Sequence, residues 1–217
     1  PLVWDALVAA LPGRALTPAL PGHGSRPAPV GAWRDEIDAL GAWLAAEGVR
    51  GAHLVGYSLG GRIARHLLDR DDLFAGATLV GAHPGLTSTS EREARRAADA
   101  RWIELLERAG VDAFVTAWEA LPLWMSQSSL PPHVVERQRA IRRSHTAAGL
   151  AGALRALGLA EMPEPPPARV PARWVVGALD EPLRAALTRA ALPLTLIRDA
   201  GHNVVLEAPG ALAELVA

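Results

Sequence analysis

The stretch that decides the fold covers residues 51–69 and reads GAHLVGYSLGGRIARHLLD. Its first part, residues 51–57, is a short apolar run suited to a buried strand, and residues 59–69 repeat apolar side chains at helical spacing. The join carries the pattern G-x-S-x-G with Ser58 at its centre. A serine on a sharp turn from strand to helix presents its hydroxyl above the sheet edge, and the small glycines allow that turn. The context predicts Ser58 as a nucleophile; the alternative is a Gly/Ser-rich turn without chemical consequence.

Short apolar strands and helices alternate on both sides of this stretch. The predicted strands cover residues 14–20, 75–82, 173–178 and 194–198, and the predicted helices cover residues 2–11, 32–46, 182–191 and 205–216. Short buried strands that alternate with helices indicate a parallel sheet covered on both faces. We therefore predict an α/β fold with a mostly parallel sheet flanked by helices.

The alternation stops in the middle of the chain, where the sequence gives no strand signal. Helical segments are expected there near residues 91–108, 111–119, 133–145 and 147–158. A proline-rich segment follows and is expected to be stiff. We expect residues 85–162 to form a helical cap inserted into a core made of residues 1–84 and 163–217.

Composition excludes several classes of protein. The chain has 217 residues, a formal net charge of −1 and 50% hydrophobic residues, which suits one domain with a sizeable core. Near-neutral charge argues against a nucleic-acid partner. The absence of cysteine excludes disulfides and a thiol nucleophile, and no apolar run is long enough for a membrane helix. We expect a cytoplasmic monomer or small homo-oligomer without a membrane partner.

A reactive serine needs a base, and the base needs an acid that orients it. In proteins with this motif the acid and then the histidine follow the serine along the chain. Asp180 and His202 each follow a predicted strand, where ligand sites of α/β folds gather. Ser58, Asp180 and His202 are the predicted triad. Glu181 and Asp199 are the alternative acids, and Asp180 is preferred.

The remaining histidines have other expected roles. We expect structural roles for His53 and His66, solvation for His133 and His145, a place beside the pocket for His83 and a loop-structuring role for His23. Their spacing matches no metal-binding motif, and no glycine-rich nucleotide loop is present. We therefore expect neither a metal nor a cofactor.

Several stretches together resemble the α/β-hydrolase superfamily. They are LPGHG at 20–24, GYSLGGR at 56–62, HPGL at 83–86, EARR at 93–96 with Asp99 and Trp102, Trp118 with PLW at 122–124 and Gln127, Arg142 with GLA at 149–151 and Leu154, GALDEPL at 177–183, and DAGHN at 199–203. The helical segment carries the more specific likeness, to the branch of 2-succinyl-6-hydroxy-2,4-cyclohexadiene-1-carboxylate (SHCHC) synthases of menaquinone biosynthesis.

That resemblance implies a carbon–oxygen lyase. Such an enzyme eliminates pyruvate from 2-succinyl-5-enolpyruvyl-6-hydroxy-3-cyclohexene-1-carboxylate, with the serine taking the proton that starts the elimination. The backbone N–H of Leu59 would stabilise an oxyanion. The resemblance assigns substrate binding to Tyr57, Arg62, Arg95, Trp118 and Arg142. Arginine binds carboxylates bidentately, which suits a small anionic carboxylate substrate.

Two further readings stay open. A hydrolase of small carboxylic esters or of carbon–carbon bonds would use the same triad, and a non-enzymatic binder would keep the fold alone. The superfamily also has strands and a His-Gly loop that would precede residue 1. We expect these N-terminal strands to be missing because the chain is a fragment of a longer product.

Overall fold

The structure is a computed structural model that describes residues 2–24, 26–29 and 31–216. It forms two compact units, each built from more than one stretch of chain. Unit 1 comprises Pro1–Trp4, Leu16–Glu36 and Gly85–Pro163, and unit 2 comprises Asp5–Ala15, Ile37–Pro84 and Glu164–Ala217.

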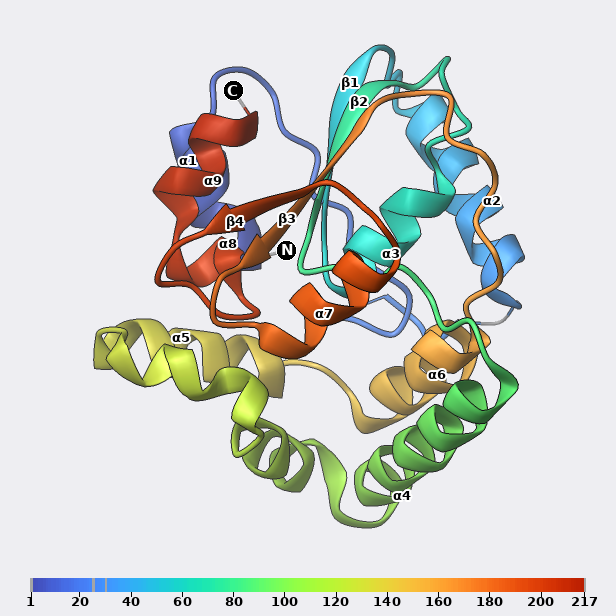
Figure 1. Cartoon of the computed structure of the whole chain (residues 1–217). Helices are drawn as coiled ribbons and strands as arrows, with labels where there is room; N and C mark the ends of the chain where they lie inside the picture. Colours follow the sequence, from blue (N-terminus) through green and yellow to red (C-terminus); the bar gives the residue numbers. More distant parts are fainter. Residues whose placement is uncertain (1, 25, 30, 217) are drawn as a thin grey trace. The chain divides into compact units, whose positions relative to one another are not determined.

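Unit 2 contains a four-stranded parallel sheet in the order β1-β2-β3-β4 (Figure 1). The strands are β1 (Ala52–Tyr57), β2 (Phe74–Val80), β3 (Ala172–Gly177) and β4 (Leu194–Ile197). The two central strands are almost wholly buried, and Leu79, Val80, Val175 and Val176 are at most 1% exposed. Strands with continuous apolar runs are typical of a parallel sheet whose two faces are both covered by helices.

The helices of unit 2 precede, connect or follow these strands in the chain. They are α1 (Asp5–Ala10), α3 (Leu59–His66), α7 (Glu181–Arg189), α8 (Val204–Glu207) and α9 (Pro209–Val216), together with most of α2 (Trp33–Ala46), whose first residues belong to unit 1. Helix α3 packs on β1 and β2, whereas α1, α8 and α9 pack on one another. The α/β class and the parallel sheet flanked by helices, as predicted, are confirmed.

Unit 1 holds helices, and none of its described residues belongs to a strand. Its elements are η1 (Leu2–Trp4), α4 (Thr89–Glu119), η2 (Pro122–Ser129), α5 (Pro132–Arg143), α6 (Ala147–Leu157) and η3 (Leu159–Glu161), drawn in green to yellow after η1 (Figure 1). Its apolar core joins the middle of α4 to α6 through Leu106, Phe114, Val115 and Leu150. Ser88 and Glu91 begin α4 with a capping box.

The strand predicted at residues 14–20 is wrong, because the structure gives this segment no strand hydrogen bonding. Pro18 has no backbone N–H to donate to a ladder, and residues 12–17 are all exposed. The segment therefore has neither the hydrogen-bonding partner nor the buried face that would hold it in a sheet.

Helix boundaries also differ from the prediction. The helices predicted at residues 91–108 and 111–119 are present as the two parts of α4, which are separated by a kink at Gly110, whose φ of 81° and ψ of −178° are not helical. The predicted helix over residues 205–216 is divided at Ala208 into α8 and α9. The 3₁₀ helix η2 was not predicted, because its serine-rich sequence lacks helical apolar periodicity.

No helix among the described residues is both long enough and apolar enough to span a membrane.

Candidate active site

Ser58 occupies a strained position between β1 and α3. Its φ is 51° and its ψ is −112°, in a region that residues with a side chain rarely adopt. The neighbouring glycines permit this turn, because a Cβ on Gly56 would meet the Gly60 carbonyl oxygen at 2.5 Å and one on Gly61 would meet the Gly56 oxygen at 2.9 Å. The turn places Ser58 directly after the last residue of β1 and before the first residue of α3.

The three side chains predicted as a triad form a hydrogen-bonded chain within unit 2. His202 Nε2 lies 3.1 Å from Ser58 Oγ, and His202 Nδ1 lies 2.7 Å from Asp180 Oδ2. A carboxylate can only accept hydrogen bonds, so Nδ1–H donates to Asp180 and leaves Nε2 as the acceptor for the serine O–H. In this arrangement His202 can take the proton of Ser58.

Asp180 is better placed than the two alternative acids. It is 4% exposed and serves as the N-cap of α7, where its Oδ1 accepts from the Leu183 N–H. Glu181 is turned to solvent and pairs with Arg184 at 2.9 Å, while Asp199 is exposed. The buried position leaves Asp180 as the carboxylate in contact with the histidine ring.

A close approach of two loops places His202. At the end of β3, a Cβ on Gly177 would overlap the carbonyl oxygens of Ala200 and Gly201, so this position accepts glycine alone. The loop after β4 can therefore lie directly against β3. Asp180, which follows β3, thus comes within hydrogen-bonding distance of His202.

Glu207 holds the histidine loop and was not predicted. Its two carboxylate oxygens accept from the backbone N–H of Gly201 at 2.7 Å and of Asn203 at 3.2 Å, the residues on either side of His202. The fully buried Asn203 side chain begins α8 by accepting from the Leu206 N–H. The sequence signal for this contact was the position of Glu207, an acidic residue four positions after the asparagine that caps α8.

The other predicted site residues of unit 2 lie close to this chain of hydrogen bonds. The Tyr57 ring centroid is 5.6 Å from that of His202. Leu59 is the first residue of α3, where a backbone N–H has no acceptor within the helix. Arg62 lies one turn further on, and its backbone N–H donates to the Ser58 carbonyl oxygen.

The remaining predicted residues belong to unit 1, and two of them have internal carboxylate partners. Arg95 Nε donates to Asp99 Oδ1 at 2.8 Å, and Arg142 Nη1 donates to Glu119 Oε1 at 2.9 Å. Trp118 belongs to an aromatic cluster, with ring centroids 5.3, 5.4 and 6.0 Å from those of Trp102, Phe114 and Trp124. The ion pairs orient both guanidinium groups before any ligand binds.

The expectation that His145 is solvated is wrong. It is half-buried, and its Nδ1 accepts from the Gly24 N–H at 2.8 Å. Its ring meets that of His23 edge to face at 5.2 Å, and His23 Nδ1–H donates to the Pro21 carbonyl oxygen. Burial, and to a lesser degree the nearby His23, lowers the pKa of His145 to about 4. His133 is exposed.

Among the residues that the structure describes, no group of three or more His, Cys, Asp or Glu side chains is arranged to hold a metal ion. In unit 2, the hydrogen-bonded serine, histidine and aspartate place a general base against a hydroxyl. A general base held against a hydroxyl can support either nucleophilic attack or proton abstraction.

Comparison with known proteins identifies the family. The model of the alpha/beta hydrolase family matches residues 1–215. The 2-succinyl-6-hydroxy-2,4-cyclohexadiene-1-carboxylate synthase of Citrobacter koseri is 34% identical over 194 residues, which is 87% of this chain and 75% of that protein. The synthase of Salmonella heidelberg is 33% identical over 199 residues, covering 89% and 78%.

Two solved structures give the same result. MenH from S. aureus is similar with a TM-score of 0.82 and 28% identity, covering 91% of this chain and 79% of that one. A thermophilic esterase from Thermogutta terrifontis, solved with malate bound, has a TM-score of 0.78 and 26% identity, covering 99% and 82%. The chain is therefore an enzyme that belongs to the alpha/beta hydrolase family.

Proposed function

We propose that the chain is a carbon–oxygen lyase of menaquinone biosynthesis. It eliminates pyruvate from 2-succinyl-5-enolpyruvyl-6-hydroxy-3-cyclohexene-1-carboxylate and yields SHCHC. The observation that carries this proposal is the hydrogen-bonded chain of Ser58, His202 and Asp180. It occurs in a sequence about one third identical to proteins named as SHCHC synthases.

In the proposed mechanism Ser58 acts as a base. His202 Nε2 takes the serine proton, and the resulting alkoxide removes a proton from the substrate ring. The electrons of that carbon–hydrogen bond form a new ring double bond, the existing ring double bond shifts by one position, and the bond between the ring and the enolpyruvyl oxygen breaks. The proton held by His202 then passes to the departing enolate, which gives pyruvate and restores the starting charge. Asp180 holds the histidine in the tautomer that this sequence requires.

In this mechanism the two parts of the chain have different roles. A core of residues 1–84 and 163–217 carries the triad, with the Leu59 N–H as an oxyanion donor. The cap of residues 85–162 supplies Arg95, Trp118 and Arg142, while Tyr57 and Arg62 contribute substrate contacts from the core. The substrate carries several carboxylates, and oriented guanidinium groups are suited to such groups.

A hydrolase of small carboxylic esters is the second candidate. The likeness to the Thermogutta terrifontis esterase favours it, because that likeness covers 99% of this chain. A neutral ester has no carboxylate for the cap arginines to bind. Substitution of these arginines should therefore affect lyase activity and leave esterase activity nearly unchanged.

Pyruvate release separates the two candidates. Wild type and Ser58→Ala are assayed with the enolpyruvyl substrate and with a p-nitrophenyl ester, and exposed Ser129→Ala is the matched control. If the chain is the lyase, we expect wild type to release pyruvate rapidly and to show weak esterase activity. We expect Ser58→Ala to reduce pyruvate release by at least about 10³-fold. Ester cleavage without pyruvate release would replace the lyase by the hydrolase.

A further inference from the structure

The longest stretch of unit 1, Gly85–Pro163, begins and ends with short connecting segments. The entry segment, residues 85–88, precedes α4, and the exit segment, residues 159–163, follows α6 and contains η3. The chain passes from unit 2 into unit 1 through the entry segment and returns through the exit segment. Arg92 of α4 contacts both segments.

The guanidinium group of Arg92 donates to three backbone carbonyl oxygens. From the first turn of α4, its Nη2 donates to Leu86 of the entry segment at 2.9 Å. Its Nη1 donates to Ala160 at 2.9 Å and to Met162 at 2.8 Å, both in the exit segment. One side chain therefore joins the two ends of the stretch to the start of α4.

The exit segment depends on this donor. Ala160 belongs to η3 and Met162 caps its C-terminal end, where the last carbonyl groups have no donor within the helix. Both residues are at most 2% exposed, which leaves little access for water. A buried carbonyl oxygen without a donor costs free energy. Loss of the Arg92 guanidinium should therefore loosen the exit segment.

Polar contacts hold the start of α4 in place. Among the described residues, the apolar core that joins α4 to α6 includes no side chain of α4 before Trp102. Arg96 makes two hydrogen bonds to the Glu161 carboxylate of η3, at 2.6 and 3.3 Å. Asp99 is buried so close to the turn between α6 and η3 that a Cβ on Gly158 would lie 3.2 Å from its Oδ2. The first turns of α4 thus rest on the exit segment.

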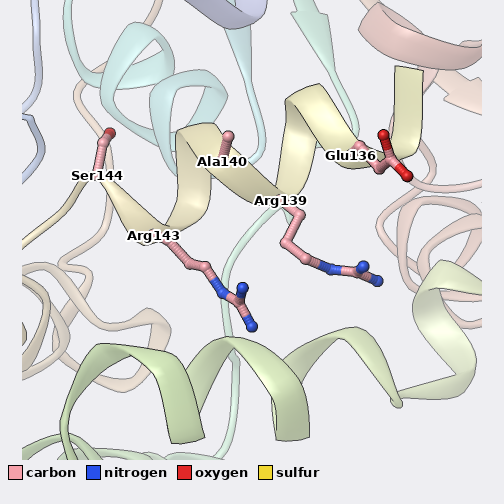
Figure 2. Close-up of a pocket in the computed structure, with 5 residues that line it drawn as sticks. All are labelled: Glu136, Arg139, Ala140, Arg143 and Ser144. Carbon is pink, nitrogen blue, oxygen red and sulfur yellow. The ribbon is translucent and has the colours of Figure 1, made fainter. Parts of the chain in front are cut away.

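Ion pairs to α5 hold the other part of α4. Figure 2 shows Arg139 and Arg143 extending from one side of α5. Their partners are Glu119 and Asp112, and both acids lie beyond the kink at Gly110. Because Gly110 interrupts the helical backbone, these pairs leave the direction of the first part to the contacts at its own end.

We propose that Arg92 is a positioning residue for substrate recognition. By fixing the first turns of α4 on the exit segment, it fixes the place of Arg95, which lies one turn further along the same helix. Arg95 is one of the residues proposed to bind a substrate carboxylate, and Asp99 holds its Nε at 2.8 Å. The inference rests on the proposed function, because that function gives Arg95 a substrate to bind.

Steady-state kinetics of pyruvate release test this role. Arg92→Lys keeps the positive charge, but a single ammonium group cannot reproduce the fork that reaches three carbonyl oxygens. Arg92→Gln removes the charge as well. We expect both variants to raise KM about five- to tenfold and to leave kcat within about twofold of wild type. Arg108→Gln is the matched control, because exposed Arg108 pairs with Glu104 within α4, and its KM should stay at the wild-type value.

A double-mutant cycle with Arg95→Gln separates positioning from an independent contact. If Arg92 acts through Arg95, Arg92→Lys raises KM in wild type and hardly changes it in Arg95→Gln. A merely structural role would not give this dependence on Arg95. The inference is overturned if the two effects on KM multiply. It is also overturned if Arg92→Lys keeps the wild-type KM, because charge alone would then account for Arg92→Gln.

Hydrogen exchange tests the same contacts without turnover. Amide exchange is followed by mass spectrometry in peptides that cover the entry and exit segments. We expect at least about tenfold faster exchange there in Arg92→Gln, with exchange in β2 and β3 unchanged and Arg108→Gln like wild type. Unchanged exchange in both segments would contradict the inference. Wild type that releases no pyruvate would reject the proposed function, and exchange would still decide whether Arg92 holds the two segments.

Discussion

The two units of this chain place their polar groups in different ways. In unit 2 the reactive groups meet because backbone elements approach closely at glycines, as at Gly177 against the histidine loop. In unit 1 the arginines are oriented by carboxylates on helix surfaces, as with Glu119 between two arginines. Close backbone packing fixes the positions of the reactive atoms, whereas long arginine side chains can adjust to a ligand. The comparison suggests that changes in unit 2 reduce kcat and that changes in unit 1 raise KM.

The largest expected effect comes from Asp180→Asn. Asparagine keeps an oxygen for the Leu183 N–H at the start of α7, but its amide no longer stabilises the required histidine tautomer. We expect kcat to fall by about 10⁴-fold with KM nearly unchanged. Steady-state pyruvate release checks this, and exposed Asp199→Asn is the control. A loss below tenfold would remove Asp180 from the mechanism.

Gly61→Ala is expected to affect stability strongly. Its Cβ would lie 2.6 Å from Ala82 Cβ and 2.9 Å from the Gly56 oxygen, and neither atom belongs to a flexible side chain. Overpacking of this kind costs about 1–3 kcal/mol of the free energy of unfolding. Gly210→Ala in α9 is the matched control, because a Cβ there meets no atom within 4 Å. Urea titration measures both variants, and equal midpoints would contradict the packing argument.

Arg95→Gln tests the recognition role assigned to unit 1. Loss of the guanidinium should raise KM for the carboxylate substrate roughly tenfold, since a hydrogen bond to a charged group contributes about 1.5–3 kcal/mol. Cleavage of a neutral ester should hardly change. Arg101→Gln on the same helix is the control, because Arg101 is exposed. An equal effect on both substrates would indicate that Arg95 serves stability through Asp99 alone.

Glu207→Gln tests how the histidine loop is held. The substitution replaces one of the two carboxylate oxygens of Glu207, which accept from the Gly201 and Asn203 N–H groups, by an amide nitrogen that cannot accept. We expect kcat to fall about tenfold, because a ring displaced by a fraction of an ångström transfers the proton less well. KM should stay constant, which a purely structural role would not predict. Exposed Glu214→Gln serves as the control.

The sequence indicated which side chains of unit 2 lie together better than it indicated how they are held in place. The motif at Ser58 and the strand ends before Asp180 and His202 were readable because residue type and local context coincide there. Glu207 was missed, since its role depends on a loop closing onto a helix start. The strand predicted at residues 14–20 was wrong, because local apolar character does not supply a neighbouring strand.

Unit 1 was predicted less completely for a related reason. Helical periodicity identified its main segments, but nothing local indicates that Glu119 would pair with two arginines of α5. Contacts between distant side chains depend on helix packing, which a single sequence leaves open.

The smallest expected effect concerns His145 and the loop that it holds. Its folded pKa of about 4 lies below the ordinary value of 6.5, so the unfolded chain binds more protons between these two values. The stabilisation is therefore complete above pH 6.5 and is lost as the pH falls towards 4. Because the ring is partly exposed, we expect a loss of about 1 kcal/mol rather than the full linkage value.

His145→Asn isolates this contribution, because an asparagine oxygen can replace Nδ1 as the acceptor for the Gly24 N–H without titrating. The free energy of unfolding is measured by urea titration at pH 7 and at pH 4.5 for wild type, His145→Asn and exposed His133→Asn. The pH dependence of wild type and His133→Asn should agree, and that of His145→Asn should be shallower. Identical slopes in all three proteins would show that His145 does not contribute to the acid sensitivity of the chain.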